Sequence, residues 1–250
     1  MPHPLGMMMI RMKLLIVSDI HANLEALQAV LAEPHDALWV LGDLVNYGPN
    51  PSEVVELVRA HASLVVQGNH DYAIGSGSDP RCSDAFREMA RAMQEYTEPL
   101  LDADQRAFLR NLPRTAARTI DGYRFFLCHA TPTEPLFQYC RAEPAQWAPE
   151  IEGIQADIVL TGHTHLPFTL NLEKLRIVNP GSVGQPKHGA AMACYALWEN
   201  GRQSHRSCRY PVGDTVKKLL ALPIPMGIRN QLAAVLLSGF LPGRGEQAAI

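Results

Sequence analysis

Six short apolar runs, each ending at a small or polar residue, constrain the fold of this chain more than any other feature. They occupy residues 13–17, 37–41, 63–67, 123–128, 157–160 and 175–179. The runs are four to six residues long and are rich in Val, Leu, Ile and aromatic residues. Runs of this length and composition are typical of buried strands, whereas an apolar helix needs about ten residues or more.

Helical patterns separate the first three of these strands. Residues 23–33 place apolar side chains at helical spacing behind Asn23, which predicts a helix with Asn23 as its N-cap. Residues 51–61 predict a second helix that begins near Pro51 and Ser52. Strands that alternate with helices indicate an α/β layered fold.

The second half of the chain departs from this alternation. We expect two helices within residues 83–113, divided at Pro99. After residue 175 the pattern becomes β again, and Asn200-Gly201 predicts a hairpin turn. A last helical stretch is expected from about residue 214.

No Gly/Ser/Pro-rich linker, low-complexity tract or internal repeat divides the 250 residues. We therefore expect a single domain over residues 1–250. Within it, residues 75–118 would form a helical insertion and residues 214–250 a helical extension. Both would shape access to a functional site at the strand ends.

Composition excludes several classes of function. The net charge of −3 gives no electrostatic basis for non-specific nucleic-acid binding. No run is long and apolar enough to span a bilayer, and the Met-rich start lacks the basic head and cleavage site of a signal peptide. The five cysteines form no C-x-x-C pair, so a disulfide framework and a thiolate zinc site are not expected. This usage fits a reducing cytoplasm.

Polar residues with metal-binding side chains follow five of the predicted strands. They are Asp19, His21, Asp43, Asn69, His70, Asp71, His129, His163 and His165. Each residue alone has an ordinary interpretation as a helix cap, a turn residue or a hydrogen-bonded histidine. Because the carboxyl ends of strands in open α/β sheets form the ligand crevice, their coincidence at successive strand ends indicates one shared site.

The mixture of side chains indicates the kind of metal. Carboxylate, amide and imidazole ligands without thiolate suit Mn, Fe, Zn, Co or Ni. Five histidines, two aspartates and an asparagine are too many ligands for one tetrahedral ion. They suit two ions about 3.5–4 Å apart with one carboxylate bridging them.

The ordered blocks "DIH", "GD", "GNHD", "CHA" and "GHTH" resemble the calcineurin-like metallophosphoesterase superfamily. The segments "NYGPNP" and "NPGSVGQPKHG" resemble its small bacterial and archaeal phosphodiesterase branch. The resemblance covers residues 13 to about 190. It implies a four-layer α-β-β-α sandwich of two mixed sheets flanked by helices.

The resemblance also implies the roles of the site residues. One ion would be held by Asp19, His21 and His165, the other by Asn69, His129 and His163, and Asp43 would bridge both. The two divalent or trivalent transition-metal ions would be manganese first, with Fe, Zn, Ni or Co as alternatives. A hydroxide that bridges the ions would attack phosphorus in line with the leaving oxygen.

His70 follows Asn69 and receives no metal in this comparison. The resemblance implies that it stabilises the transition state or protonates the leaving group; the alternative is that it only orients the site. We expect Asp71 to be a turn or helix cap. Lys187 and His188 could line the mouth of the site, but we expect a solvated loop there.

One block departs from the serine/threonine protein phosphatases of the superfamily. They carry an Asp and an Arg where this chain has Asn46 and Tyr47. A tyrosine cannot clamp a phosphate as a guanidinium does. This weakens the protein-phosphatase and symmetrical dinucleotide-polyphosphatase interpretations and favours a phosphodiester monoanion over a monoester dianion.

The sequence thus predicts a cytoplasmic, dinuclear-metal phosphoesterase, with phosphodiesterase activity favoured. Its partner would be a small phosphoester substrate, without non-specific nucleic-acid binding or a membrane. One alternative is a phosphomonoesterase or protein phosphatase on the same site. The other is a non-catalytic metal-binding scaffold, against which the complete ligand set including His70 argues.

Overall fold

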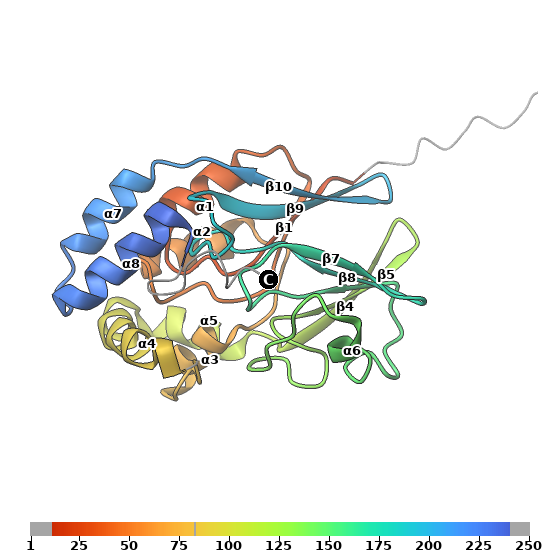
Figure 1. Ribbon diagram of the computed structural model, residues 1–250, viewed down its shortest axis with the longest axis horizontal. Coiled ribbons are helices and arrows are strands. Elements are labelled where there is room, and N and C mark those ends of the chain that lie inside the picture. The colour runs from red at the N-terminus through yellow and green to blue at the C-terminus, as the bar shows by residue number, and fades with distance from the viewer. Residues whose placement is uncertain (1–11, 83, 241–250) are drawn as a thin grey trace, which may run out of the picture.

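Two five-stranded sheets form the centre of the computed structural model, which describes residues 12–82 and 84–240 (Figure 1). The first sheet has the order β10 (Arg202–Cys208), β9 (Ala193–Glu199), β1 (Leu14–Val17), β2 (Ala37–Val40) and β3 (Leu64–Val65). The second has the order β4 (Thr115–Ile120), β5 (Tyr123–Cys128), β6 (Ile158–Leu160), β8 (Arg176–Asn179) and β7 (Phe168–Asn171). In the first sheet β1, β2 and β3 are parallel, and β9 and β10 pair in antiparallel fashion. In the second sheet β5, β6 and β8 are parallel, and the edge strands β4 and β7 are antiparallel to their neighbours.

Strand β1 shows why its sequence is apolar without alternation. Leu14 and Ile16 face the second sheet, where they share a core with Phe125. Leu15 and Val17 face the opposite way, into a core with the helices. Successive side chains of a strand point to opposite faces, so a strand covered on both sides must be apolar throughout.

Helices cover the outer face of each sheet. On the first sheet lie α1 (Leu24–Leu31), α2 (Pro51–His61) and α5 (Ala103–Asn111). The second is covered by the short helix α6 (Pro144–Trp147) and neighbouring loops, with Trp147 packed against Val159 and Ile177. The predicted α-β-β-α sandwich of two mixed sheets is confirmed.

A further group of helices lies at one end of the sandwich (Figure 1). It contains α4 (Asp84–Thr97), the 3₁₀ turn η1 (Glu98–Leu100), α7 (Val212–Leu220) and α8 (Met226–Ser238). Met89 and Met93 of α4 are buried in one apolar cluster with Leu232 and Leu236 of α8. The methionines of the expected helix therefore serve packing.

The local predictions agree with the structure in most places. The side chain of Asn23 accepts a hydrogen bond from the amide of Ala26, as an N-cap does. The hairpin turn between β9 and β10 has Asn200 and Gly201 at φ 55° and 73°. The two helices expected within residues 83–113 are α4 and α5. The Met-rich start lies outside the described residues.

Two strands differ from the predictions. Strands β4 and β7 were not expected, because their sequences TAARTI and FTLN lack a clear apolar face. Both are edge strands held by backbone pairing with one neighbour. Helix α2 begins at Pro51 as predicted, with Asn50 at the N-cap position, and the Ser52 hydroxyl donates to Gln105. No helix among the described residues is long and apolar enough to cross a membrane.

Candidate metal centre

The candidate site lies where the loops after three strands of the first sheet meet the loops after two strands of the second. Strands β1, β2 and β3 lead to Asp19, His21, Asp43, Asn69 and His70. Strands β5 and β6 lead to His129, His163 and His165. All eight side chains are buried. Asn69 and His70 are the first two residues of helix α3 (Asn69–Ser76), so the helix fixes their backbone.

The backbone is strained at this edge. Asp19, His21, Asp43, His163 and His165 all have positive φ values, between 46° and 64°. A non-glycine residue in this region costs about 1–3 kcal/mol, and such residues cluster at functional sites. Backbone hydrogen bonds hold the strain in place: the amide of His21 donates to Asp43 O (2.9 Å) and that of Asp19 to Gly42 O (3.0 Å).

A first cluster consists of Asp19, His21 and His165. The Nε2 atoms of the two histidines are 3.1 Å apart, and Asp19 Oδ1 lies 3.3 Å from His165 Nε2 and 3.9 Å from His21 Nε2. Ligand atoms that share an ion at about 2.1 Å lie roughly 3–3.5 Å apart. Two of the three distances match this spacing, and the third, from Asp19 Oδ1 to His21 Nε2, is slightly longer.

A second cluster consists of Asp43, His129 and His163, with Asn69 beside them. His129 Nε2 lies 3.3 Å from Asp43 Oδ2, 3.2 Å from His163 Nδ1 and 3.1 Å from Asn69 Oδ1. The amide of Asn69 is oriented by Nδ2, which donates to Pro80 O (2.7 Å). Its oxygen therefore faces the histidines.

Asp43 lies between the two clusters. Its Oδ2 atom is 3.6 Å from His21 Nε2 in the first cluster and 3.3 Å from His129 Nε2 in the second. Its other oxygen accepts a hydrogen bond from the backbone amide of His70 (2.9 Å). One carboxylate oxygen can therefore contribute to both clusters at once.

Each histidine of the two clusters has its second ring nitrogen next to a backbone carbonyl. The pairs are His21 Nδ1 with Val45 O (3.1 Å), His129 Nδ1 with Leu41 O (2.7 Å), His165 Nδ1 with Gln185 O (2.7 Å) and His163 Nε2 with Phe137 O (3.3 Å). Donation to a carbonyl places the proton on that nitrogen and leaves the other as a free lone pair. Four lone pairs therefore point into the site.

Electrostatics also fit cations at this position. Burial lowers the pKa of His21 and His163 well below the usual value, so both rings are neutral. Burial would raise the pKa of Asp19, but His165 and His129 outweigh it and the pKa is lowered. Asp19 Oδ1 is buried without a hydrogen-bond donor. An ionised oxygen in this state is costly unless a cation neutralises it, so the donor set fits metal ions.

His129, from the other sheet, also shows that this position favours positive charge. Burial lowers its pKa, but the charge and hydrogen bond of Asp43 outweigh burial and raise the pKa to about 9. In the metal-free protein a proton on His129 thus supplies positive charge next to Asp43. A metal ion and this proton compete for the same lone pair.

His70 lies beside the clusters with both ring nitrogens engaged. Nδ1 accepts from the side-chain Nδ2 of Asn46 (2.9 Å), which leaves the proton on Nε2, 3.4 Å from Cys82 Sγ. Tyr47 packs against the ring at 4.7 Å between centroids, and its hydroxyl lies 3.3 Å from Cys82 Sγ. Tyr47 and Cys82 thus border the side of His70 that carries the proton.

Asp71 forms the helix cap expected of it and also ties two loops together. One carboxylate oxygen accepts from the backbone amides of Gly68 (3.0 Å) and Asp43 (2.8 Å), and the other from Leu44 (2.8 Å). Burial and the charge of Asp43 raise its pKa to about 6. Asp71 is therefore a support for Asp43 rather than a member of either cluster.

Sequence reasoning missed two residues near the clusters and misjudged a third. Tyr139 stacks on His163 with ring centroids 3.9 Å apart, and Cys82 contacts His70. Neither stands in a recognisable pattern, so no sequence signal could have identified it. Lys187 was expected in a solvated loop, but its side chain is partly buried and its charge acts on His165.

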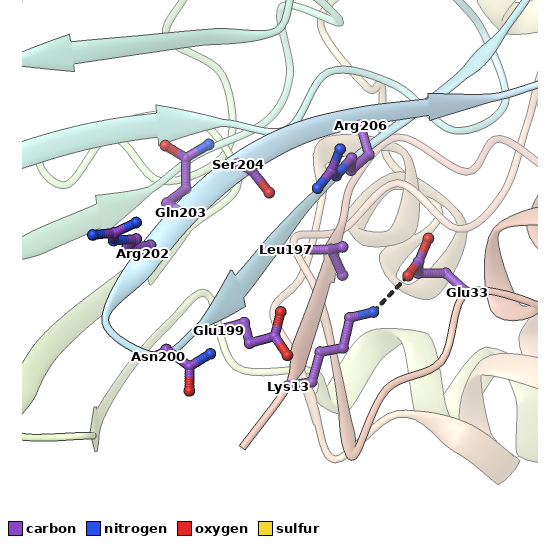
Figure 2. A pocket seen from close by; sticks show the side chains of 9 residues that line it. All are labelled: Lys13, Glu33, Leu197, Glu199, Asn200, Arg202, Gln203, Ser204 and Arg206. Atoms are coloured by element: carbon purple, nitrogen blue, oxygen red, sulfur yellow. Dashed lines mark hydrogen bonds and ion pairs between the residues drawn. The ribbon is translucent and has the colours of Figure 1, made fainter. Parts of the chain in front are cut away.

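A hollow lies away from the site, beside the hairpin of β9 and β10 (Figure 2). Lys13, which pairs there with Glu33 at 2.6 Å, comes just before β1, whereas the site lies after its other end. Arg202 and Arg206 of β10 line the same hollow, and Figure 2 shows their side chains apart from each other. This hollow contains none of the clustered residues.

Comparison with known proteins relates the chain to one family. A family model described as the calcineurin-like phosphoesterase superfamily domain matches residues 12–201. A crystal structure of a metallophosphoesterase from Sphaerobacter thermophilus shares 34% identity and covers 89% of this chain and 98% of its own, with a TM-score of 0.75.

Curated relatives carry different names. An uncharacterised protein of Methanocaldococcus jannaschii, MJ0912, is 32% identical, and the match covers 76% of this chain and 84% of that protein. Phosphodiesterase YfcE of Escherichia coli is 29% identical over 76% of this chain and 88% of its own length. A symmetrical bis(5'-nucleosyl)-tetraphosphatase of Vibrio cholerae is 31% identical, but the match covers 56% of this chain and 51% of the relative.

Proposed function

The chain belongs to the calcineurin-like phosphoesterase superfamily, and from this premise we propose that it is a dinuclear-metal phosphoester hydrolase that prefers phosphodiesters. One observation carries the proposal. Two clusters of buried ligand atoms share Asp43, whose Oδ2 lies 3.6 Å from His21 Nε2 and 3.3 Å from His129 Nε2. A shared carboxylate is what a two-ion centre requires and a single-ion site does not.

The ligand roles follow the two clusters. Asp19, His21 and His165 would hold one ion, and Asn69, His129 and His163 the other, with Asp43 on both. When bound, the ions would supply a nucleophile at neutral pH and neutralise charge on the phosphoryl group. Oxygen and imidazole donors without thiolate support manganese as the first candidate, with iron, zinc, nickel or cobalt as alternatives.

His70 would act on the leaving group. The amide of Asn46 donates to Nδ1, so the neutral ring carries its proton on Nε2. That nitrogen lies on the side of the ring away from Asn46, and Asp43 fixes the residue through its backbone amide. A donor held in this way can protonate the leaving oxygen or stabilise charge as it develops there.

The preference for diesters rests on the residues beside His70. Tyr47, at the position where protein phosphatases carry an arginine, is buried and uncharged, and its hydroxyl contacts Cys82. A monoester dianion needs more positive charge than a diester monoanion, so this departure favours the diester. The likeness to YfcE, whose name is phosphodiesterase, agrees with this preference.

Two further properties complete the proposal. All five cysteines carry free thiols, which supports a reducing, cytoplasmic location. The substrate would be a small phosphoester, because the net charge of −3 gives no footprint for binding along nucleic acid.

The test is a rate comparison on protein loaded with manganese, and on the same protein stripped by chelation. Bis(p-nitrophenyl) phosphate and p-nitrophenyl phosphate serve as diester and monoester. We expect hydrolysis to require metal, the diester to give the higher kcat/KM, and elemental analysis to find two ions per chain. His70→Ala should lower kcat roughly 10²–10⁴-fold while both ions remain bound.

The alternatives give different results in the same experiment. A higher kcat/KM for the monoester would favour a phosphomonoesterase, and rapid cleavage of a dinucleoside tetraphosphate would favour the activity named for the Vibrio relative. If metal-loaded protein hydrolysed no phosphoester and His70→Ala changed nothing, the chain would be a metal-binding scaffold instead.

A further inference from the structure

The segment that follows β8 is fixed against the first cluster. The amides of Val183 and Gly184 donate to Ser18 O and Asp19 O, each at 3.0 Å. A Cβ atom at Gly184 would approach Ile20 O to 1.7 Å, so only glycine permits this contact. Gln185 O then accepts from His165 Nδ1 at 2.7 Å. The backbone beside His165 is therefore held in place up to Gln185.

Lys187 follows this fixed segment after a single proline. Its side chain is partly buried, and Nζ lies 4.9 Å from the ring centroid of Phe86 on α4. Burial lowers the pKa of Lys187, whereas the charges of Asp19 and Asp43 raise it. Lys187 in turn helps burial to lower the pKa of His165. Phe86 packs against the apolar cluster that contains Tyr47 and Cys82, which border His70, and Gln185, two residues before Lys187, is bonded to His165. These contacts place the ammonium at the edge of the site.

The ammonium has no hydrogen-bonded or ion-paired anionic partner within residues 12–82 and 84–240. Among the residues that the structure describes, no hydrogen bond or ion pair to Lys187 Nζ is formed, and the Phe86 ring is its one aromatic contact. A partly buried ammonium without an acceptor is unfavourable, and an anion that binds beside it relieves that cost. Most exposed lysines need no such partner, because water solvates them.

We propose that Lys187 is a substrate-binding residue, which donates a charge-assisted hydrogen bond to a non-bridging oxygen of the phosphoester. It would supply, from the loop after β8, the one positive charge that Tyr47 does not supply from the loop after β2. A single ammonium matches the single negative charge of a phosphodiester. The inference rests on the proposed function and identifies a determinant of its substrate class.

The test compares three variants with the wild type, all loaded with manganese. Lys187→Met removes the charge and keeps a flexible side chain, whereas Lys187→Arg keeps the charge. Lys174→Met is the matched control, since Lys174 is exposed at the other end of β8. The measurements are the Kd of inorganic phosphate by calorimetry, kcat and KM for bis(p-nitrophenyl) phosphate, and the metal content.

For Lys187→Met we expect the Kd of phosphate to rise roughly tenfold to a hundredfold, since a hydrogen bond to a charged group contributes about 1.5–3 kcal/mol. KM should rise with it, both ions should remain, and Lys187→Arg and Lys174→Met should stay within threefold of the wild type. A Kd within twofold of the wild type for Lys187→Met would overturn the inference. Loss of an ion from this variant would also overturn it, because the lysine would then act on the ligands.

Phosphate binding separates this inference from the proposed function. A wild type that binds phosphate through Lys187 but hydrolyses no ester would refute the activity and keep the binding role. If the wild type hydrolyses the diester and Lys187→Met is unchanged in KM and Kd, the binding role is refuted and the activity is kept.

Discussion

The two sheets contribute different chemistry to the same site. The first sheet would supply every oxygen ligand of the proposed centre, namely Asp19, Asp43 and Asn69, together with His21, and it also carries His70. The second sheet supplies only imidazoles, from His129, His163 and His165. Negative charge is therefore concentrated on one half of the sandwich, and each cluster is complete only when the two sheets are packed together. Metal binding should consequently be linked to the packing of the sheets.

Asp43 is the strongest test of this division, because it is the first-sheet residue that reaches both clusters. Asp43→Asn keeps the shape but removes the charge that two cations would share. We expect kcat to fall roughly 10⁴-fold, about 5.5 kcal/mol, with loss of at least one ion. Steady-state kinetics and elemental analysis measure both effects. Asp104→Asn, at an exposed position of α5, is the control.

Retention of two ions and near wild-type kcat by Asp43→Asn would mean that Asp43 does not bridge. The two clusters would then be independent, and the contrast between the sheets would have no consequence for activity.

His163 and His165 test the second sheet. They are one residue apart, yet His163 Nδ1 lies 3.2 Å from His129 Nε2, whereas His165 Nε2 lies 3.1 Å from His21 Nε2. We expect His163→Ala and His165→Ala to empty different metal positions, each lowering kcat roughly 10³-fold, about 4 kcal/mol. Anomalous scattering from crystals of each variant would show which position is lost. If both substitutions removed the same ion and left the other fully occupied, the assignment of the pair would be wrong.

The strand ends could be predicted from the sequence because they depend only on local sequence patterns. A short apolar run predicts a strand, and parallel strands place their carboxyl ends at one edge, so the convergence of Asp19, Asp43 and Asn69 needs no further information. The second sheet turns its own edge toward the first because of how the two sheets pack, and this packing is not a local property of the sequence. The strand-end rule predicted one shared site for all of these residues, but only the resemblance to a family predicted that two sheets form it.

The remaining site residues could not be found in this way. Lys187, Tyr139 and Cys82 stand in loops, and each reaches the site only because a distant segment fixes it. Lys187 depends on Phe86 of α4, and Tyr139 stacks on His163. Strands β4 and β7 were missed for a related reason, since they are held by backbone pairing while their side chains carry little pattern.

The Asp43–His129 pair joins the sheets and gives the metal-free protein a pH dependence. The pKa of His129 is raised to about 9 in the folded protein, above the unfolded value of about 6.5. The stabilisation is thus fully present below pH 6.5 and is lost as the pH rises through 9. We expect the free energy of unfolding of metal-free protein to fall by roughly 2–3 kcal/mol between pH 6.5 and 9.

Chemical denaturation at several pH values measures this dependence. His129→Gln should flatten it, and manganese should remove it by displacing the proton. Metal-free wild type whose stability rises with pH over the same range would show that the pair carries no shared proton.

Different residues hold the loops of each sheet together by hydrogen bonds. Substituting these residues should give the smallest effect on stability. In the first sheet Asp71 accepts three backbone amides, from Gly68, Asp43 and Leu44. In the second sheet a neutral Asn179 does comparable work: it donates to Gly162 O (2.6 Å) and accepts from the amide of Gly181 (2.9 Å).

Asp71→Asn therefore tests whether the loops of the first sheet need a charged hydrogen-bond acceptor. The substitution leaves one acceptor oxygen where two were used, so at least one buried amide loses its partner, at a cost of about 1–3 kcal/mol. It also removes the repulsion from Asp43 that raises the pKa of Asp71, which offsets part of that cost. We expect a net loss of about 1–2 kcal/mol in the free energy of unfolding of metal-free protein, and a larger loss with manganese, because ions that neutralise Asp43 leave no repulsion for the substitution to relieve. Asn179→Ala should cost a similar amount without this dependence on metal. A more stable Asp71→Asn variant would show that charge repulsion between Asp71 and Asp43, and not the loss of a hydrogen bond, dominates this part of the first sheet.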